Sequence, residues 1–452
     1  MADPTDEPKS STGSETRQHI GVALSGGGHR ASLFGLGALL YLIDSGKGPE
    51  LATVSSISGG SLTNGFVGMT IDLASVKPTD FWREVRPFAR QVGAGGTVWA
   101  APLTWAYLAT GVALLGAAVL VTIILGAAWA WLVWLVALLA LGWVAQQRSW
   151  VAARSFDRAL FHGRRLDTMH ARVAHVICAA DLQTAEHVYF SARFVNAWRV
   201  GWGVPGDLRL ARAVQASAAL PGAFNSVTLP VRRHRFPGAP ELRSFRLTDG
   251  GVYDNMGTEW PIRLARRLRE GSPPSPPPAN ADELIVVNAS AGQGVVNRTS
   301  LRTPLVGEIT LLLAVKDVLY DQTTAVRRRL LDLRFRAARG GLSVPEGPLN
   351  GALVQIDRSP YDLPDAFARG NDEFALRARA ALEVLGPNQR EAWEEEAKAN
   401  QGVKTRLSKI PRARAISLIR HAYVLAMVNS HVLLGYELLA VPDDSRLQEL
   451  LL

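Results

Sequence analysis

Three consecutive glycines, Gly26, Gly27 and Gly28, lie between two apolar segments of the chain. The segment before them, residues 20–24, has the length and branched side chains of a buried strand, and residues 31–43 form an apolar run of helical length. Glycine lets consecutive backbone N–H groups turn outward and approach a ligand closely, and the start of a helix adds positive potential. The run therefore predicts an anion site, either a phosphate cradle or an oxyanion hole.

The glycine run does not match the common nucleotide-binding motifs. A P-loop closes with Gly-Lys-Ser/Thr, and no such triplet follows Gly28. The dinucleotide motif G-x-G-x-x-G is not matched either, and no acidic residue ends a second strand at the required place. Taken alone the run can also be a plain tight turn, so its meaning depends on the rest of the sequence.

Ser58 follows a second predicted strand at residues 51–57 and precedes an apolar segment at 62–69. Its surroundings approximate G-x-S-x-G, with Ser56 in place of the first glycine. That motif places a serine on a sharp strand-to-helix turn, with its hydroxyl exposed at the start of the helix. Ser61 lacks the flanking pattern and is the lesser candidate for a nucleophile. Serine–glycine turns are common, so this motif alone does not decide the function.

Asp249 ends a third predicted strand, which begins at Ser244, and two glycines follow it. An aspartate at a strand end can point its carboxylate into a site, although an Asp-Gly turn is often only structural. The next polar residues, Asp254 and Asn255, are expected to cap the loop rather than to bind a ligand.

Together these three elements resemble the patatin-like phospholipase family, which includes the catalytic module of cytosolic phospholipase A2. That family combines a G-G-G-x-R/K oxyanion loop, a G-x-S-x-G nucleophile turn and a D-G-A/G aspartate, in that order. The resemblance covers residues 19–70 and 165–290. The matching stretches are Gly26-Gly27-Gly28-His29-Arg30, Ser56-Ile57-Ser58-Gly59-Gly60, Asp249-Gly250-Gly251, and the segments 216–224 and 252–257.

The resemblance implies a three-layer α/β sandwich with a central, largely parallel sheet. It also implies a Ser–Asp dyad, in which Ser58 attacks an ester carbonyl and Asp249 acts as the general base. The glycine loop of Gly26, Gly27 and Gly28 would form the oxyanion hole, above all through the amides of Gly27 and Gly28. Arg30 would orient this loop or pair with a substrate phosphate, unless it is an ordinary arginine at a helix start. No metal or other cofactor is required.

The most unusual segment of the chain runs from Gln91 to Gln147 and carries no charged residue. As one helix it would greatly exceed a bilayer core of about 30 Å, so two passes with a turn near Gly126 fit better. Arginines flank both ends, which by the positive-inside rule places both ends in the cytoplasm. A re-entrant hairpin, or a hairpin buried in a soluble core, is the alternative.

The sequence therefore predicts a patatin-like domain interrupted by a transmembrane helical hairpin. Ser58 precedes the hairpin and Asp249 follows it, so a shared site requires an even number of crossings. We expect an integral membrane protein with its catalytic domain facing the cytoplasm. The expected division is a disordered polar tail at 1–18, domain parts at 19–90 and 148–440, the hairpin at 91–147 and a C-terminal tail at 441–452.

Composition narrows the classes of partner. The chain has 452 residues and a net charge of +9, which favours an anionic membrane surface. Its single cysteine excludes a disulfide framework and any zinc site built on several thiolates. No nucleic-acid-binding signature is present, so a membrane lipid is the expected substrate and no nucleic acid is expected to bind.

Two other functions stay open at this level. One is a catalytically silent membrane scaffold, in which the glycine-rich turns only support folding. The other is an α/β-hydrolase-type esterase with a triad of Ser58, Asp249 and His421, in the chain order of that class. His421 lies in an apolar helical stretch, where a packed histidine is the more ordinary outcome.

Overall fold

The computed structural model describes residues 19–237, 241–290, 306–340 and 343–452. Its centre is a ten-stranded sheet in the order β10-β9-β1-β2-β3-β4-β5-β6, with β8 added to β3 and β7 added to β8. The strands are β1 (Ile20–Leu24), β2 (Leu51–Ser56), β3 (Ala174–Asp181), β4 (Glu186–Phe190), β5 (Val195–Ala197), β6 (Gly201–Gly203), β7 (Val227–Pro230), β8 (Ser244–Asp249), β9 (Glu283–Asn288) and β10 (Asn350–Gln355).

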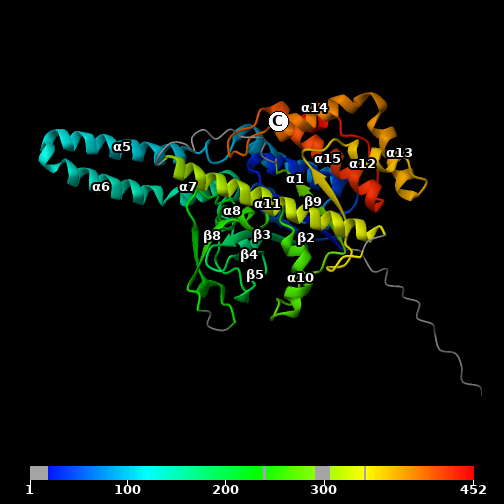
Figure 1. The fold of residues 1–452 in the computed structure, drawn as a ribbon, viewed down its shortest axis with the longest axis horizontal. Coiled ribbons are helices and arrows are strands. Elements are labelled where there is room, and N and C mark those ends of the chain that lie inside the picture. The colour runs from blue at the N-terminus through cyan, green and yellow to red at the C-terminus, as the bar shows by residue number, and fades with distance from the viewer. Residues whose placement is uncertain (1–18, 238–240, 291–305, 341–342) are drawn as a thin grey trace, which may run out of the picture.

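Helices surround this sheet and extend from it (Figure 1). They are α1 (Gly28–Asp44), α2 (Gly59–Thr70), α3 (Pro78–Glu84), α4 (Arg86–Arg90), α5 (Pro102–Leu125), α6 (Ala127–Ala145), α7 (Arg148–Phe156), α8 (Leu210–Ser217), α9 (Gly251–Asp254), α10 (Glu259–Arg269), α11 (Val306–Ala338), α12 (Asp362–Phe367), α13 (Glu373–Leu385), α14 (Arg390–Gln401), α15 (Arg412–Leu434) and α16 (Asp444–Glu449).

The sheet is mixed, which corrects the expectation of a largely parallel sheet. Strands β10, β9, β1, β2 and β3 pair with one another in parallel. From β3 onward the pairs β3–β4, β4–β5, β5–β6, β3–β8 and β7–β8 are antiparallel. Short connections such as residues 182–185 cause this change, because a turn of that length can join only antiparallel strands.

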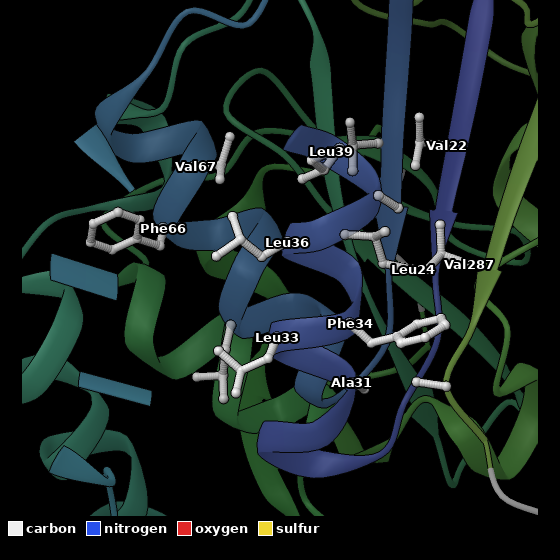
Figure 2. Close-up of a cluster of buried hydrophobic side chains, with 14 of the residues drawn as sticks. Val22, Leu24, Ala31, Leu33, Phe34, Leu36, Leu39, Phe66, Val67 and Val287 are labelled. Carbon is white, nitrogen blue, oxygen red and sulfur yellow. The ribbon is translucent and has the colours of Figure 1, made fainter. Parts of the chain in front are cut away.

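Both faces of the parallel half are covered, so the expected three layers are present. On β1, Val22 and Leu24 belong to the core cluster beneath α1, whereas Ala23 belongs to a second cluster with Leu331 and Phe335 of α11. Figure 2 shows the first of these clusters between α1 and the sheet. Successive strand side chains point to opposite faces, so a strand buried on both sides is apolar throughout.

Helices α5 and α6 form a hairpin that projects away from the α/β body (Figure 1). They turn at Gly126, whose φ of +78° ends the first helix. Both helices are long and apolar enough to cross a membrane by length and composition, and only 6% of each apolar window is buried. Side chains such as Ile123 and Leu138 are exposed, so this chain does not bury the hairpin in its own core.

The boundaries of the hairpin are narrower than the uncharged segment. Residues 91–101 precede α5, and Val92 and Val98 among them are buried in the main core. The residues at 441–452, expected as a tail, include α16 and bury Leu447 and Leu451. The expected disordered tail at 1–18 lies outside the described residues.

Helices α1 and α15 approach closely at Gly37. A Cβ added there would lie 2.2 Å from the carbonyl oxygen of Ile419, whereas a Cβ at Gly35 would make an ordinary 3.5 Å contact with Leu24. We predict that Gly37→Ala destabilises the protein by about 2 kcal/mol, because overpacking against backbone outweighs the gain of about 1 kcal/mol in helix propensity. The matched variant Gly35→Ala should be neutral or slightly stabilising. Thermal unfolding of both variants tests this, and equal midpoints would contradict it.

Candidate active site

Ser58 occupies a strained turn between β2 and α2. Its φ of +49° and ψ of −113° lie where residues other than glycine are seldom found. The flanking glycines are required by crowding: a Cβ on Gly59 would lie 2.0 Å from the carbonyl oxygen of Gly28, and one on Gly60 would lie 2.7 Å from that of Leu24. The turn therefore has the strained form that the G-x-S-x-G pattern predicts.

Hydroxyl groups beneath the turn hold it in place. The N–H of Ser58 donates to Oγ of Ser217 (2.9 Å), and Ser61 Oγ lies 2.9 Å from the same oxygen. Oγ of Ser56 accepts hydrogen bonds from Ser61 (3.1 Å) and from Nδ2 of Asn64 (2.9 Å). Ser56 thus fits where the family motif has glycine, because its side chain joins this network. The sequence analysis did not indicate Asn64, and it placed Ser217 in the family-like segment 216–224 without giving it a role.

The three glycines of the loop differ in what their N–H groups do. The N–H of Gly26 donates to the carbonyl oxygen of Asn255 (2.9 Å), and the next donor along, His29, bonds to the carbonyl of Arg406 (2.9 Å). Among the described residues, the N–H groups of Gly27 and Gly28 have no acceptor. Both glycines have positive φ, at +141° and +61°. These two amides are therefore the ones available to a ligand anion.

Strand β3 brings Asp249 to the serine turn. Ser56, the last residue of β2, pairs with Ile177 of β3, and Asp249 at the end of β8 pairs with Ala179, two residues further along. Strand β8 therefore pairs with β3 just beyond the point where β2 ends and its chain turns at Ser58. The Asp249 carboxylate is buried, and its Oδ1 accepts a hydrogen bond from the N–H of Gly251 (2.8 Å).

One cavity of about 580 Å³ collects all the predicted site residues. Ser58 and Asp249 line it together with Gly26, Gly27, Gly28 and Arg30. Residues from α11, including Tyr320, and from the start of the hairpin complete its wall. Among the described residues, no group of three His, Cys, Asp or Glu side chains is placed to hold a metal ion.

Arg30 is buried behind the glycine loop. Its Nη1 donates to the carbonyl oxygens of Val403 (2.5 Å) and Gln401 (3.4 Å), so the guanidinium ties the loop to the segment after α14. Burial lowers the pKa of Arg30 to about 10, which leaves it protonated at neutral pH. These contacts are those of a loop-orienting residue, and the side chain also lines the cavity.

His421 does not reach the cavity. It is fully buried in α15, with Nε2 2.8 Å from the carbonyl oxygen of Arg358 and Nδ1 3.3 Å from Nδ2 of Asn400. No histidine in the described part of the chain lines the cavity. A triad of Ser58, Asp249 and His421 is therefore not formed.

Tyr320 of α11 is a cavity residue that the motifs did not predict. Its ring packs over Gly251, where a Cβ would lie 2.6 Å from it, and its hydroxyl is buried with no partner among the described residues. Burial raises the pKa of the phenol, and the nearby charge of Asp249 raises it further. No local pattern could reveal this residue, because α11 lies far from the other motifs in the sequence.

Asp254 has the capping role expected of it. Its carboxylate accepts hydrogen bonds from the N–H groups of Met256 (3.0 Å) and Glu259 (2.7 Å) and forms an ion pair with Arg327. Asn255 donates from Nδ2 to Ser290 (2.8 Å) while its backbone holds Gly26. These residues fix the loop after Asp249 against the glycine loop.

A mixed sheet between helical layers, with these three motifs at one edge, defines a patatin-like α/β fold. The family profile for patatin-like phospholipases matches residues 22–260, which contain the glycine loop, the serine turn and the aspartate. The chain belongs to the patatin-like phospholipase family.

Among solved structures, human GIVD cytosolic phospholipase A2 is similar with 13% identity and a TM-score of 0.45. Its complex with methyl gamma-linolenyl fluorophosphonate and terbium chloride is similar with 12% identity and a TM-score of 0.44. These matches cover 96% of this chain but only 62% and 59% of the human chain. VipD from Legionella pneumophila has 12% identity, a TM-score of 0.28 and coverages of 96% and 90%. No curated protein matches.

Two buried histidines, His29 and His187, contact backbone carbonyl groups near the site. Their burial predicts that the folded protein loses stability in acid. Nδ1 of His29 lies 2.9 Å from the carbonyl oxygen of Ser408, and Nε2 of His187 lies 2.8 Å from that of Gly250. Burial lowers the pKa of each to about 4. In the unfolded chain each pKa is about 6.5, so below that pH the unfolded state binds more protons than the folded state.

We therefore predict full stability above about pH 6.5 and a progressive loss toward pH 4, of about 3 kcal/mol for each histidine. Thermal midpoints between pH 8 and pH 4 measure this. The variant His29→Asn keeps a donor for Ser408 but cannot titrate, so its midpoint should fall less steeply with acid. A slope equal to that of the wild type would contradict the assignment.

Proposed function

We propose that this protein is a lipid acyl hydrolase that cleaves fatty acyl esters through Ser58 and Asp249. The observation that carries this proposal is the opening of the strained serine turn, the Asp249 carboxylate and the glycine loop into one cavity. Membership of the patatin-like phospholipase family supports the same reaction class.

In the proposed reaction, Oγ of Ser58 bonds to the ester carbonyl carbon while its proton passes to Asp249. The tetrahedral oxyanion receives hydrogen bonds from the N–H groups of Gly27 and Gly28, whose donors are already oriented. Collapse breaks the bond to the alcohol oxygen, which takes the proton from Asp249. Water, deprotonated by the same carboxylate, then releases the fatty acid and restores the serine. Preoriented donors matter because each is worth about 10²–10³ in rate.

We further propose that the hairpin spans the membrane twice and holds the catalytic domain at its cytoplasmic surface. Helix α5, with 24 residues, is about 36 Å long and α6, with 19, about 29 Å, which suits a hydrocarbon core of about 30 Å. Ala118 and Ala137 are the buried residues near the middle of these helices, and small residues allow close helix packing in lipid. Arginines at both ends and the net charge of +9 favour an anionic surface.

We predict that Ser58→Ala and Asp249→Asn each lower fatty acid release from phospholipid vesicles by about 10³-fold or more, because each removes a group that acts in the transition state. The measurement compares detergent-purified wild type and variants at equal concentration, with a fluorophosphonate probe to count reactive serines.

The matched control is Ser61→Ala, which changes a neighbouring buried hydroxyl of the same network. It should keep activity within about tenfold of the wild type, since it removes supporting hydrogen bonds only. Equal behaviour of the wild type, Ser58→Ala and Asp249→Asn would overturn the proposal and favour a catalytically silent scaffold.

Cysteine labelling tests the proposed topology. The only native cysteine, Cys178, is buried, so single introduced cysteines report cleanly. With two crossings, Ala128→Cys at the exposed hairpin turn should react with an impermeant maleimide added outside intact cells, whereas Gln183→Cys on the catalytic domain should react only after lysis. A re-entrant hairpin would leave both unlabelled in intact cells, and reaction of Gln183→Cys there would exclude a cytoplasmic domain.

A further inference from the structure

The cavity that contains Ser58 is not closed by the α/β body alone. Part of its lining comes from the residues that lead into α5 and from the first turns of α5, and two further residues, Arg148 and Val151, come from α7 just after the hairpin. The positions on α5 are spaced i, i+3 and i+4, so they lie on one face of the helix. The lining residues in this region are Val98 and Trp99, which precede α5, and Thr104, Tyr107 and Leu108, which lie on it.

Both ends of the hairpin are fixed to elements that build the site. At the first end, Nε2 of His29, which follows the glycine loop, lies 2.9 Å from Oγ1 of Thr97. At the second end, the N–H of Ser149 donates to Oδ1 of Asn225 (2.9 Å), next to the lining residue Phe224. The hairpin base is therefore a built part of the cavity wall.

The polar and the apolar residues that line the cavity come mainly from different elements. The glycine loop, Ser58 and Asp249 supply the polar groups at the reacting centre. The hairpin base and the 220–224 loop supply apolar surface, including Leu108, Leu220 and Phe224, while Arg148, Asp317, Asp321 and Arg406 add charged groups to the lining. A ligand with a polar ester and a long hydrocarbon chain matches this division, because burying each methylene of the chain is favourable.

The position of the lining residues along α5 matches the depth of a lipid ester. If the hydrocarbon core of about 30 Å is filled by about 20 helical residues counted back from Leu125, it begins near residue 106. Thr104, Tyr107 and Leu108 then lie at the boundary between headgroups and acyl chains, where the ester bonds of bilayer lipids are found.

Helix α11 borders the same cavity with an apolar outer surface. Tyr320 lines the cavity together with Asp317 and Asp321, and the nearby side chains of Val315, Val318 and Leu319 are exposed by 48%, 59% and 51%. Residues of α11 and of α7, at the base of the hairpin, line this one cavity. Two elements that border the cavity thus present apolar side chains to the outside, and this suits contact with lipid rather than water.

We propose that α5 forms the acyl-chain wall of the active site, and that the substrate is a long-chain ester reaching Ser58 from the bilayer with its chain against Tyr107 and Leu108. This inference rests on the proposed hydrolase function. In this arrangement the hairpin selects the substrate as well as anchoring the protein, because its first turns determine how much chain the cavity holds.

The test compares turnover of p-nitrophenyl esters with chains of four to sixteen carbons by the full-length protein in detergent. Leu108→Trp fills the wall and should lower kcat/KM for the long-chain esters by about tenfold or more, equivalent to lost contact with about two methylenes. The ratio of kcat/KM for the sixteen-carbon ester to that for the four-carbon ester should therefore fall by about tenfold. The matched control, Leu115→Trp, lies two turns further along the same face of α5, outside the cavity, and should keep the wild-type profile.

Each result decides between definite alternatives. Identical chain-length profiles for Leu108→Trp and Leu115→Trp would overturn the acyl-wall proposal while leaving the hydrolase function intact. No turnover of any ester by the wild type, together with an unlabelled Ser58, would instead overturn the function itself. If Leu108→Trp loses fluorophosphonate labelling, the variant Leu108→Ala serves as the test instead. It should weaken the preference for long-chain esters about threefold. An unchanged preference would refute the proposal.

Discussion

The backbone of Gly59, just after the serine turn, touches the backbone of Gly28 in the glycine loop. A single added carbon at Gly59 would lie 2.0 Å from the Gly28 carbonyl oxygen, so no side chain fits between the two segments. This contact fixes where the N–H groups of the loop lie relative to the hydroxyl of Ser58. The surrounding structure supports it: Ser217 holds the serine turn, while Asn255 and Arg30 hold the loop.

The position of Asp249 depends on a different constraint, the register in which β3 pairs with its neighbouring strands. This strand pairs with β2 up to Ile177 and with β8 from Ala179. Strand β8, which ends at Asp249, therefore takes the place beside β3 that β2 leaves before the turn at Ser58. The change from parallel to antiparallel pairing at β3 makes this exchange possible.

The hairpin and the catalytic domain share structure at the point where they meet. His29 bridges from the glycine loop to Thr97, and residues at the base of α5 border the same cavity as the serine. Insertion of the hairpin between the serine turn and the strand that ends at Asp249 therefore need not separate them, because residues beside the cavity hold both ends of the hairpin. In the proposed reaction this brings the ester of a bilayer lipid to a site that is itself at the membrane surface.

Local pattern determined the motifs and most elements: the strand before Gly26, the serine turn, the strand before Asp249 and the hairpin turn at Gly126 all lie where the sequence predicts them. These features follow from neighbouring residues, since glycine, chain period and charge act over a few positions. Only the tertiary structure decided the mixed sheet, the exclusion of His421 and the arrival of Tyr320 in the cavity. Those outcomes depend on pairing and packing between segments far apart in the chain, which no local pattern encodes.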